Sequence, residues 1–361
     1  MRRRLIGFDL FRIGAALVIF LFHSQIHIQC DYGFLNEFVS MGAVFMTGFF
    51  MLSGFSLYYG YETADFSHLK NIVNFYKKRA IGILPNYYVI ALLYIIFISK
   101  DYWLNFLLAP VELLGIQTFF TSLFPFSHNS GTWFISCMIV CYGIFPFLDI
   151  CLKQMRPRAR IVMIALLSFV LLYAPFIVIL FQVARIYSNP FFRLLEFSIG
   201  ALLCSLIREL GATKVFRQRL FVRWSPLVAC LVLVVGVTQA VVANFYPGNY
   251  MIYSWITLPL FSFLLVSLAL GDFALLERSK TIQYLSGISY SFFLVQFFAW
   301  PIVKAIESNF GVITNSNKII FSLGLCLVMA TALYHGVEKP SKSLLHERHA
   351  TGPLTAKRQS D

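Results

Sequence analysis

Residues 5–28, LIGFDLFRIGAALVIFLFHSQIHI, decide the fold of this chain, because the run is long and apolar enough to cross a bilayer. It follows a basic N-terminus, MRRR at 1–4, and so has the outline of a secretory signal. However, Asp9 and Arg12 interrupt the apolar stretch, and no small-residue cleavage site follows it. We therefore expect a retained first membrane helix.

Further runs of the same kind follow along the chain. Nine have the length of a membrane span: 38–60, 82–99, 132–150, 161–183, 191–207, 226–246, 251–271, 286–306 and 318–337. The composition agrees, because 59% of the residues are hydrophobic and 12% are charged, against about 25% charged in a soluble domain. This excludes an ordinary soluble enzyme and a disordered chain.

The stretch 103–123 is ambiguous, since it is apolar but contains Pro110, Glu112 and Gln117. The positive-inside rule decides its interpretation. With a cytoplasmic N-terminus and no crossing at 103–123, 23 of the 29 Lys and Arg residues lie on the cytoplasmic side. Four lie outside: Lys100, Arg185, Lys304 and Lys318. A crossing would move every later basic segment outside, so we interpret 103–123 as re-entrant or interfacial.

The sequence thus predicts an all-α polytopic membrane bundle of about ten transmembrane helices, with one re-entrant or interfacial segment and both ends in the cytoplasm. A membrane-embedded domain is expected over 1–345, followed by a polar, disordered cytoplasmic tail at 346–361. The net charge of +13 then reflects topology and does not indicate nucleic-acid binding.

The first helix carries ionisable side chains where they are costly, and such residues mark functional sites by default. Arg12 and His23 are eleven residues apart, which places them within about 20° of one another and roughly 16 Å apart along a helix. His27 follows one turn later, and Asp9 is spaced to pair with Arg12. The structural alternative is that Arg12 reaches the interface and His23 bonds to a neighbouring helix.

Seven segments between residues 7 and 340 resemble, in order, the signatures of the acyltransferase-3 family. They are FRIGAALVIFLFHS at 11–24, FFMLSGF at 49–55, FYKKRAIGILP at 75–85, GTWFISCMIVCYGIFP at 131–146, RLLEFSIG at 193–200, ISYSFFLVQ at 288–296 and GVEKP at 336–340. Three departures stand out. Gly82 replaces the second Arg of the basic segment, Gln296 replaces a His, and neutral Cys137 and Met138 stand where many members are acidic.

The resemblance implies a membrane-bound O-acetyltransferase of the bacterial inner membrane. It would move an acetyl group from cytoplasmic acetyl-CoA to a hydroxyl of a surface glycan (O-antigen, capsule or exopolysaccharide) or its lipid-linked precursor. His23 would act as general base or brief acyl carrier, with Arg12 as a charge anchor. Arg79 and Lys78 would bind the donor phosphates. The implied partners are acyl-CoA, the sugar acceptor and membrane lipid, with no metal and no nucleic acid.

The resemblance also extends to four candidate substrate contacts: Trp133, Ser136, Arg193 and Glu196. Arg193 and Glu196 are three residues apart, so a structural ion pair is an equal alternative to an acceptor site. His128 and Asn129 lie in an outer loop where an acceptor site is possible, and we expect Glu338 to cap the last helix.

Other classes of function stay open. A multi-helix transporter or flippase is the main alternative, although no internal repeat is visible in the sequence. An acyltransferase that uses another acyl group, such as succinyl, or another acceptor is equally compatible with the motifs.

Overall fold

The computed structural model describes residues 4–99, 101–119, 132–181, 186–210, 219–242, 254–311 and 314–343. Within these ranges all regular structure is helical. The helices are α1 (Ile6–Ile28), α2 (Asn36–Ser40), α3 (Phe45–Tyr61), α4 (Leu69–Phe97), α5 (Tyr102–Leu113), α6 (Trp133–Gln154), α7 (Pro157–Phe181), α8 (Pro190–Leu210), α9 (Arg219–Val242), α10 (Ser254–Leu270), α11 (Lys280–Phe310) and α12 (Asn315–Leu333). A π-helical turn, η10 (Tyr334–Glu338), prolongs α12.

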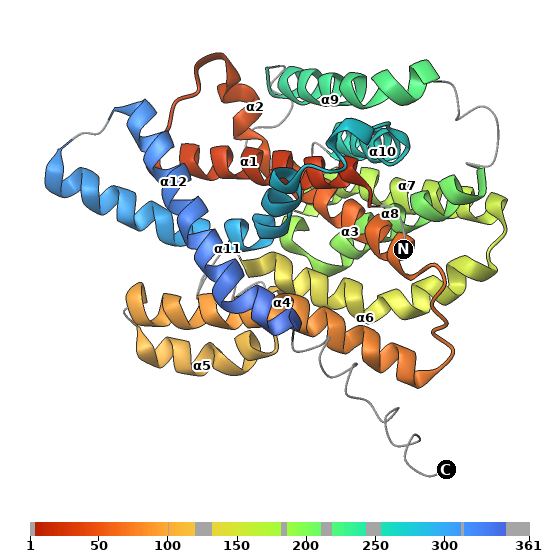
Figure 1. Cartoon of the computed structure of the whole chain (residues 1–361), viewed down its shortest axis with the longest axis horizontal. Coiled ribbons are helices and arrows are strands. Elements are labelled where there is room, and N and C mark those ends of the chain that lie inside the picture. Colours follow the sequence, from red (N-terminus) through yellow and green to blue (C-terminus); the bar gives the residue numbers. More distant parts are fainter. Residues whose placement is uncertain are drawn as a thin grey trace, which may run out of the picture.

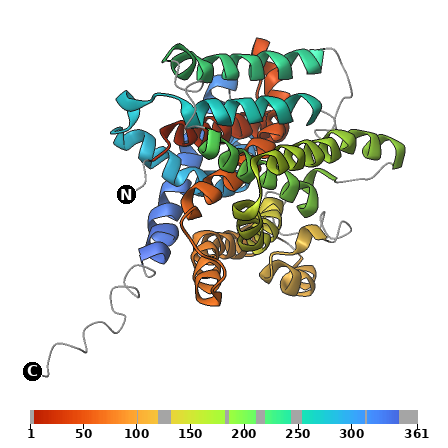
Figure 2. The same cartoon turned by 90° about the vertical axis from the view of Figure 1, so that its right-hand side faces the viewer.

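The described helices form a polytopic membrane bundle, as the sequence predicts. Nine of them are long and apolar enough to cross a bilayer, and the apolar α10, with 17 residues, falls just short of that length. Each of the ten predicted spans corresponds to one described helix. The long helices lie side by side, with α9 and α10 along one edge and α4 and α5 along the opposite edge (Figures 1 and 2). The predicted tail, 346–361, lies outside the described residues.

The first part of the predicted segment 103–123 forms a short helix that is folded back on α4. Helix α5 has 12 residues, about 18 Å, against roughly 30 Å of hydrocarbon. Its start is capped by the Asp101 side chain. At its other end, the hydroxyls of Tyr87 and Tyr88, midway along α4, donate to the carbonyl oxygens of Glu112 and Leu113 at 2.6 and 2.7 Å. A helix of this length is too short to cross a bilayer, and a re-entrant or interfacial position for the segment stays a prediction.

The basic segment at 70–79 differs from the prediction. The sequence predicts a span that begins at residue 82, but the basic segment forms the first turns of the same helix, α4, which begins at Leu69. The positive-inside rule depends only on which side of the membrane a charge occupies, so it does not distinguish a loop from a helix that projects beyond the bilayer.

Helix α1 lies between two hydrophobic clusters. One cluster is built mainly from α3, α6, α8, α9 and α10 and takes Phe8 and Ile19 from α1. The other is built mainly from α4, α11 and α12 and takes Phe20 from α1. Phe49 and Phe134 pack against both clusters. A helix that is apolar on all sides is expected in such a central position, and the seam between the clusters is where the candidate site lies.

Two glycines let α3 and α8 approach closely. A Cβ atom at Gly54 would overlap the carbonyl oxygen of Phe197, and one at Gly200 would overlap the carbonyl oxygen of Met51. Small residues at a helix crossing allow this backbone contact, which is a main source of packing energy between membrane helices. By contrast, a Cβ at Gly60, also on α3, would meet open space.

We therefore predict that Gly54→Ala lowers stability by about 1–3 kcal/mol, because the two backbones must separate. Gly60→Ala is the matched control and should be neutral or slightly stabilising, since alanine is the better helix former. The measurement is thermal unfolding of the purified variants in the same detergent. Equal melting temperatures for the two variants would contradict the close crossing.

The charge asymmetry generates a second prediction, on topology. A reporter fused after Asp361 should give a cytoplasmic signal, and one inserted within 124–131 should give an external signal, because 103–123 does not cross. A cytoplasmic signal from the loop, or an external one from the tail, is incompatible with ten crossings.

Candidate active site

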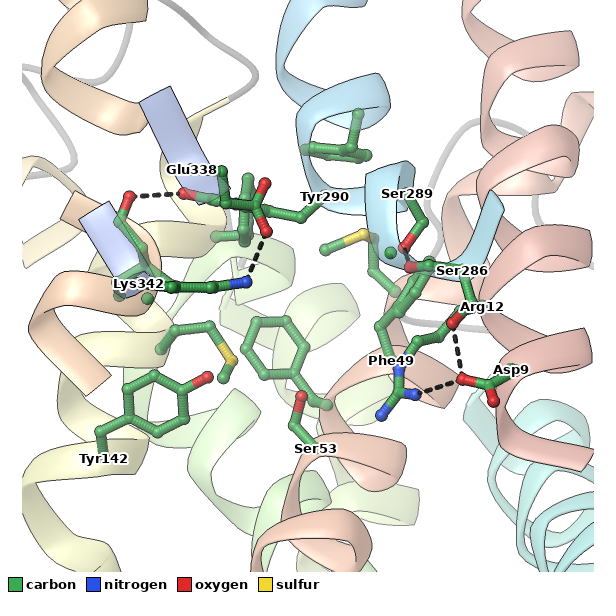
Figure 3. A pocket seen from close by; sticks show the side chains of 18 of the residues that line it. Asp9, Arg12, Phe49, Ser53, Tyr142, Ser286, Ser289, Tyr290, Glu338 and Lys342 are labelled. Carbon is green, nitrogen blue, oxygen red and sulfur yellow. Dashed lines mark hydrogen bonds and ion pairs between the residues drawn. The ribbon is translucent and has the colours of Figure 1, made fainter. Parts of the chain in front are cut away.

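A cavity of about 420 Å³ opens in the seam between the two clusters. Its walls come from α1, α3, α4, α6, α11 and the end of α12. Figure 3 shows Asp9, Arg12 and Ser286 on one side and Glu338 and Lys342 on the other. Side chains from both ends of the sequence thus meet in one space.

The first wall is organised around the carboxylate of Asp9, which is only 2% exposed. It accepts hydrogen bonds from Arg4 Nε at 2.5 Å, from Arg12 Nη1 at 3.2 Å and from Ser286 Oγ at 2.6 Å. The other Arg12 terminal nitrogen donates to Ser56 Oγ on α3 at 3.3 Å. The predicted pairing of Asp9 with Arg12 is confirmed. Because two guanidinium groups share one carboxylate, this wall keeps an excess of positive charge.

The opposite wall is organised around Glu338, in the π-helical turn. Its carboxylate accepts from Asn86 Nδ2 at 2.9 Å, from Ser291 Oγ at 2.7 Å and from Lys342 Nζ at 2.6 Å. The expectation that Glu338 caps the last helix is wrong: the side chain is buried and bonds sideways to α4 and α11. A π-helical turn adds a residue to the helix turn and occurs frequently at functional sites.

The cavity therefore carries cationic side chains on both of these walls. Arg4, Arg12 and Lys342 line it, and the side chains of all three are partly exposed. The two carboxylates that also line it, Asp9 and Glu338, are almost fully buried and accept several hydrogen bonds each. Partly exposed guanidinium and ammonium groups beside buried, satisfied carboxylates favour an anionic ligand such as a phosphate.

Aromatic rings also line the cavity, and one of them, Phe293, packs against His23. Phe293 lines the cavity, and its ring centroid lies 6.3 Å from that of His23 and 4.7 Å from that of Phe134. His23 itself does not line the cavity, whereas Arg12 does. Arg12 thus lies in the cavity wall, whereas His23 lies behind that wall and packs against the lining ring of Phe293.

His23 has one polar partner among the described contacts. Its Nδ1 atom lies 2.8 Å from Oε1 of Gln296 on α11, and its ring packs against Phe297 with centroids 5.1 Å apart. One turn further along α1, His27 stacks on Trp300 with an interplanar angle of 12°. The hydrogen bond from His23 to a neighbouring helix, which the sequence offered as the structural alternative, is present.

The predicted donor-binding residues, Arg79 and Lys78, differ in burial. Arg79 is half-buried beside three rings, with its Cζ atom 5.5 Å from the centroid of Tyr61 and 5.9 Å from that of Tyr142. Tyr142 lines the cavity, so Arg79 lies one ring away from it. Lys77 and Lys78 are exposed. Gly82, which stands where the family has a second Arg, lines the cavity directly.

The four predicted substrate contacts lie away from the cavity. Arg193 is fully buried, bonds to Glu196 at 2.8 and 3.0 Å, and lies 5.3 Å from the ring centroid of Trp133. Ser136 is also fully buried, and its hydroxyl has no hydrogen-bond partner among the described residues. Phe50 joins this group to the cavity, since it lines the cavity and lies beneath Arg193. The ion pair anticipated as the alternative is present, and a substrate role for the four residues stays a prediction. His128 and Asn129 lie outside the described residues.

Sequence reasoning assigned no site role to several residues that line the cavity or contact His23. Arg4 and Lys342 were counted only as topological charges, yet both line the cavity. Gln296 was noted only as a departure from a family motif, yet it contacts His23. Buried polar groups within apolar runs, such as Asn86 and Ser286, were the available signal, but their partners lie far away in sequence.

The described helices thus form a polytopic bundle with a cationic cavity next to a half-buried histidine. The acyltransferase-domain family model for acyltransferase-3 proteins matches residues 5–335, nearly the whole chain. The chain therefore belongs to the acyltransferase-3 family, as its motifs indicate. No curated protein and no solved structure matches it.

Proposed function

We propose that the protein transfers an acetyl group from cytoplasmic acetyl-CoA to a hydroxyl group of a surface glycan or its lipid-linked precursor, across the bacterial inner membrane. The observation that carries the proposal is the cavity, which is lined by three cationic side chains and by Phe293, whose ring packs against His23. Family membership supports acyl transfer in general. The acetyl group and the glycan acceptor rest on the motif resemblance.

The cavity suits a donor of this shape. On the topology expected from the basic residues, Arg4, Arg12 and Lys342 lie at the cytoplasmic end, where they would bind the phosphates of acetyl-CoA. The rise from Arg12 to His23 along α1 is roughly 16 Å, a distance that a long, thin pantetheine arm can span. The absence of a side chain at Gly82 widens the wall along this path, and no atom lies within 4 Å of the position its Cβ would occupy.

The chemistry would take place at His23. With Nδ1 bonded to Gln296, the second ring nitrogen is left to accept the proton of the acceptor hydroxyl. The hydroxyl oxygen then bonds to the acyl carbon, the thioester C–S bond breaks, and the proton passes to the departing CoA thiolate. Alternatively, the imidazole itself takes the acyl group first and passes it to the hydroxyl. In either route Phe293 must turn aside or be passed by the acyl group.

The first test measures the reaction itself. Purified protein in lipid nanodiscs should release CoA from acetyl-CoA in the presence of a membrane glycan fraction, and mass spectrometry should find acetyl esters on the glycan. Surface polysaccharide from cells without the protein should lack those esters. Movement of a substrate across the membrane without any acyl transfer would instead select the transporter class.

We predict that Arg79→Ala weakens the apparent affinity for acetyl-CoA by about tenfold, whereas Lys77→Ala has little effect. Arg79 is half-buried beside Tyr142 at the cavity wall, while Lys77 is exposed. The measurement is the KM for acetyl-CoA of each purified variant. Equal effects of both substitutions would show that the cluster serves topology alone.

We also predict that His23→Ala reduces acetyl transfer by roughly 100-fold or more, the usual contribution of a general base. His27→Ala should have a milder effect, because it lies one turn further along α1 and packs on Trp300. Arg12→Lys should lose activity if a planar, forked cation is required. Acetylation by each variant is compared at matched abundance in the membrane. Near-normal turnover by His23→Ala would overturn the mechanism and make the helix-one residues purely structural.

A further inference from the structure

Gln296 holds the reacting ring proposed above. Its Oε1 atom lies 2.8 Å from Nδ1 of His23, and the side chain is 0% exposed. The two residues are 273 positions apart and come from α1 and α11, which pack against each other along the membrane interior. The contact therefore depends on the tertiary fold and not on local sequence.

The atoms in contact determine where the imidazole proton resides. A carbonyl oxygen can only accept a hydrogen bond, so Nδ1 must carry the N–H. A neutral imidazole has a single N–H, so Nε2 then carries the free lone pair. We propose that Gln296 is a positioning residue that fixes His23 in the tautomer with the proton on Nδ1 and thereby presents Nε2 as the base or nucleophile. The inference rests on the proposed function, in which His23 reacts.

A purely structural role does not account for this amide. The Gln296 Nε2 atom is buried and has no hydrogen-bond partner in the part of the chain that the structure describes. An amide placed to satisfy a helix contact would use both its ends, because a buried unpaired N–H costs about 1–3 kcal/mol. The bond to His23 is the only polar contact that the described residues give this side chain.

The surroundings of His23 are otherwise apolar. The rings of Phe22, Phe293 and Phe297 pack around the imidazole from α1 and α11. The titratable neighbour of His23 is His27 on α1, and the centroids of the two imidazole rings are 6.0 Å apart. The positive charge of Lys304 on α11 acts electrostatically on His27. Gln296 is therefore the group placed to decide the tautomer.

The opposite orientation of the amide makes a distinct prediction. If the Gln296 NH₂ group donated to Nδ1, the imidazole proton would reside on Nε2, and the proposed assignment would be wrong. Gln296→Glu separates the two cases, because an ionised carboxylate can only accept. The carboxylate of a glutamate at this position would still accept a hydrogen bond from a protonated Nδ1, but it would repel the lone pair of an unprotonated Nδ1.

The experiment compares wild type, Gln296→Glu, Gln296→Leu and the control Gln283→Leu in nanodiscs, with kcat measured against pH. Gln283 is also on α11, and its side chain donates to the Glu277 carbonyl at 3.0 Å, so it controls for the loss of a glutamine hydrogen bond. Detergent melting temperatures establish that each variant is folded. Solid-state NMR of ¹⁵N-histidine protein, with His23 assigned by its loss in His23→Ala, reports directly which ring nitrogen carries the proton.

We expect Gln296→Leu to lower kcat by about tenfold or more, the usual effect of removing the partner that orients a histidine, and Gln283→Leu to leave kcat and its pH profile unchanged. Gln296→Glu should remain active with its pH midpoint shifted upward, because a carboxylate favours the charged imidazolium. NMR should find the wild-type proton on Nδ1.

The inference would be overturned by a proton on Nε2, or by an unchanged kcat and pH profile in folded Gln296→Leu. Loss of activity at every pH in folded Gln296→Glu would also overturn it. Wild type that transfers no acyl group, or active His23→Ala, would instead overturn the proposed function, and NMR would still decide the tautomer.

Discussion

A carboxylate buried inside a membrane bundle must be neutralised by its neighbours, and Asp9 imposes this requirement on several elements at once. Its partners come from the segment before α1, from α1 itself and from α11, and Arg12 extends the network to α3. Hydrocarbon offers no water to stabilise any of these groups, so each must keep its partner. The network thereby fixes the position of α1 against both hydrophobic clusters and sets the wall of the cavity.

The same requirement explains why the cavity is lined by cations that stay partly exposed. Asp9 and Glu338 are satisfied by several donors each, and both are almost completely buried. Arg4, Arg12 and Lys342 are held by these carboxylates at one end while part of each side chain stays exposed. Buried acidic groups thus act as fixed anchors for partly exposed basic ones.

The sequence predicts those features that depend on neighbouring residues. Spans follow from runs of apolar residues, and the pairs Asp9–Arg12 and Arg193–Glu196 follow from a spacing of three on a helix. The contact of His23 with Gln296 could not be foreseen, because it joins helices 273 residues apart. The cavity roles of Arg4 and Lys342 were hidden for the same reason, since a basic residue at a membrane edge satisfies the topology rule whether or not it also lines a site. The spacing of Asp9, Arg12 and His23 predicts a polar stripe on helix one, but the partners of that stripe on other helices required the fold.

The ring of Phe293 has a consequence for the membrane as a whole. It lies in the wall of the cavity, and the imidazoles of His23 and His27 lie beyond it. A continuous polar path through a membrane bundle would let ions and protons leak down their gradients. An apolar ring at this position separates the polar groups of the cavity from the two imidazoles and so interrupts such a path. The ring therefore helps the bundle to remain an electrical barrier.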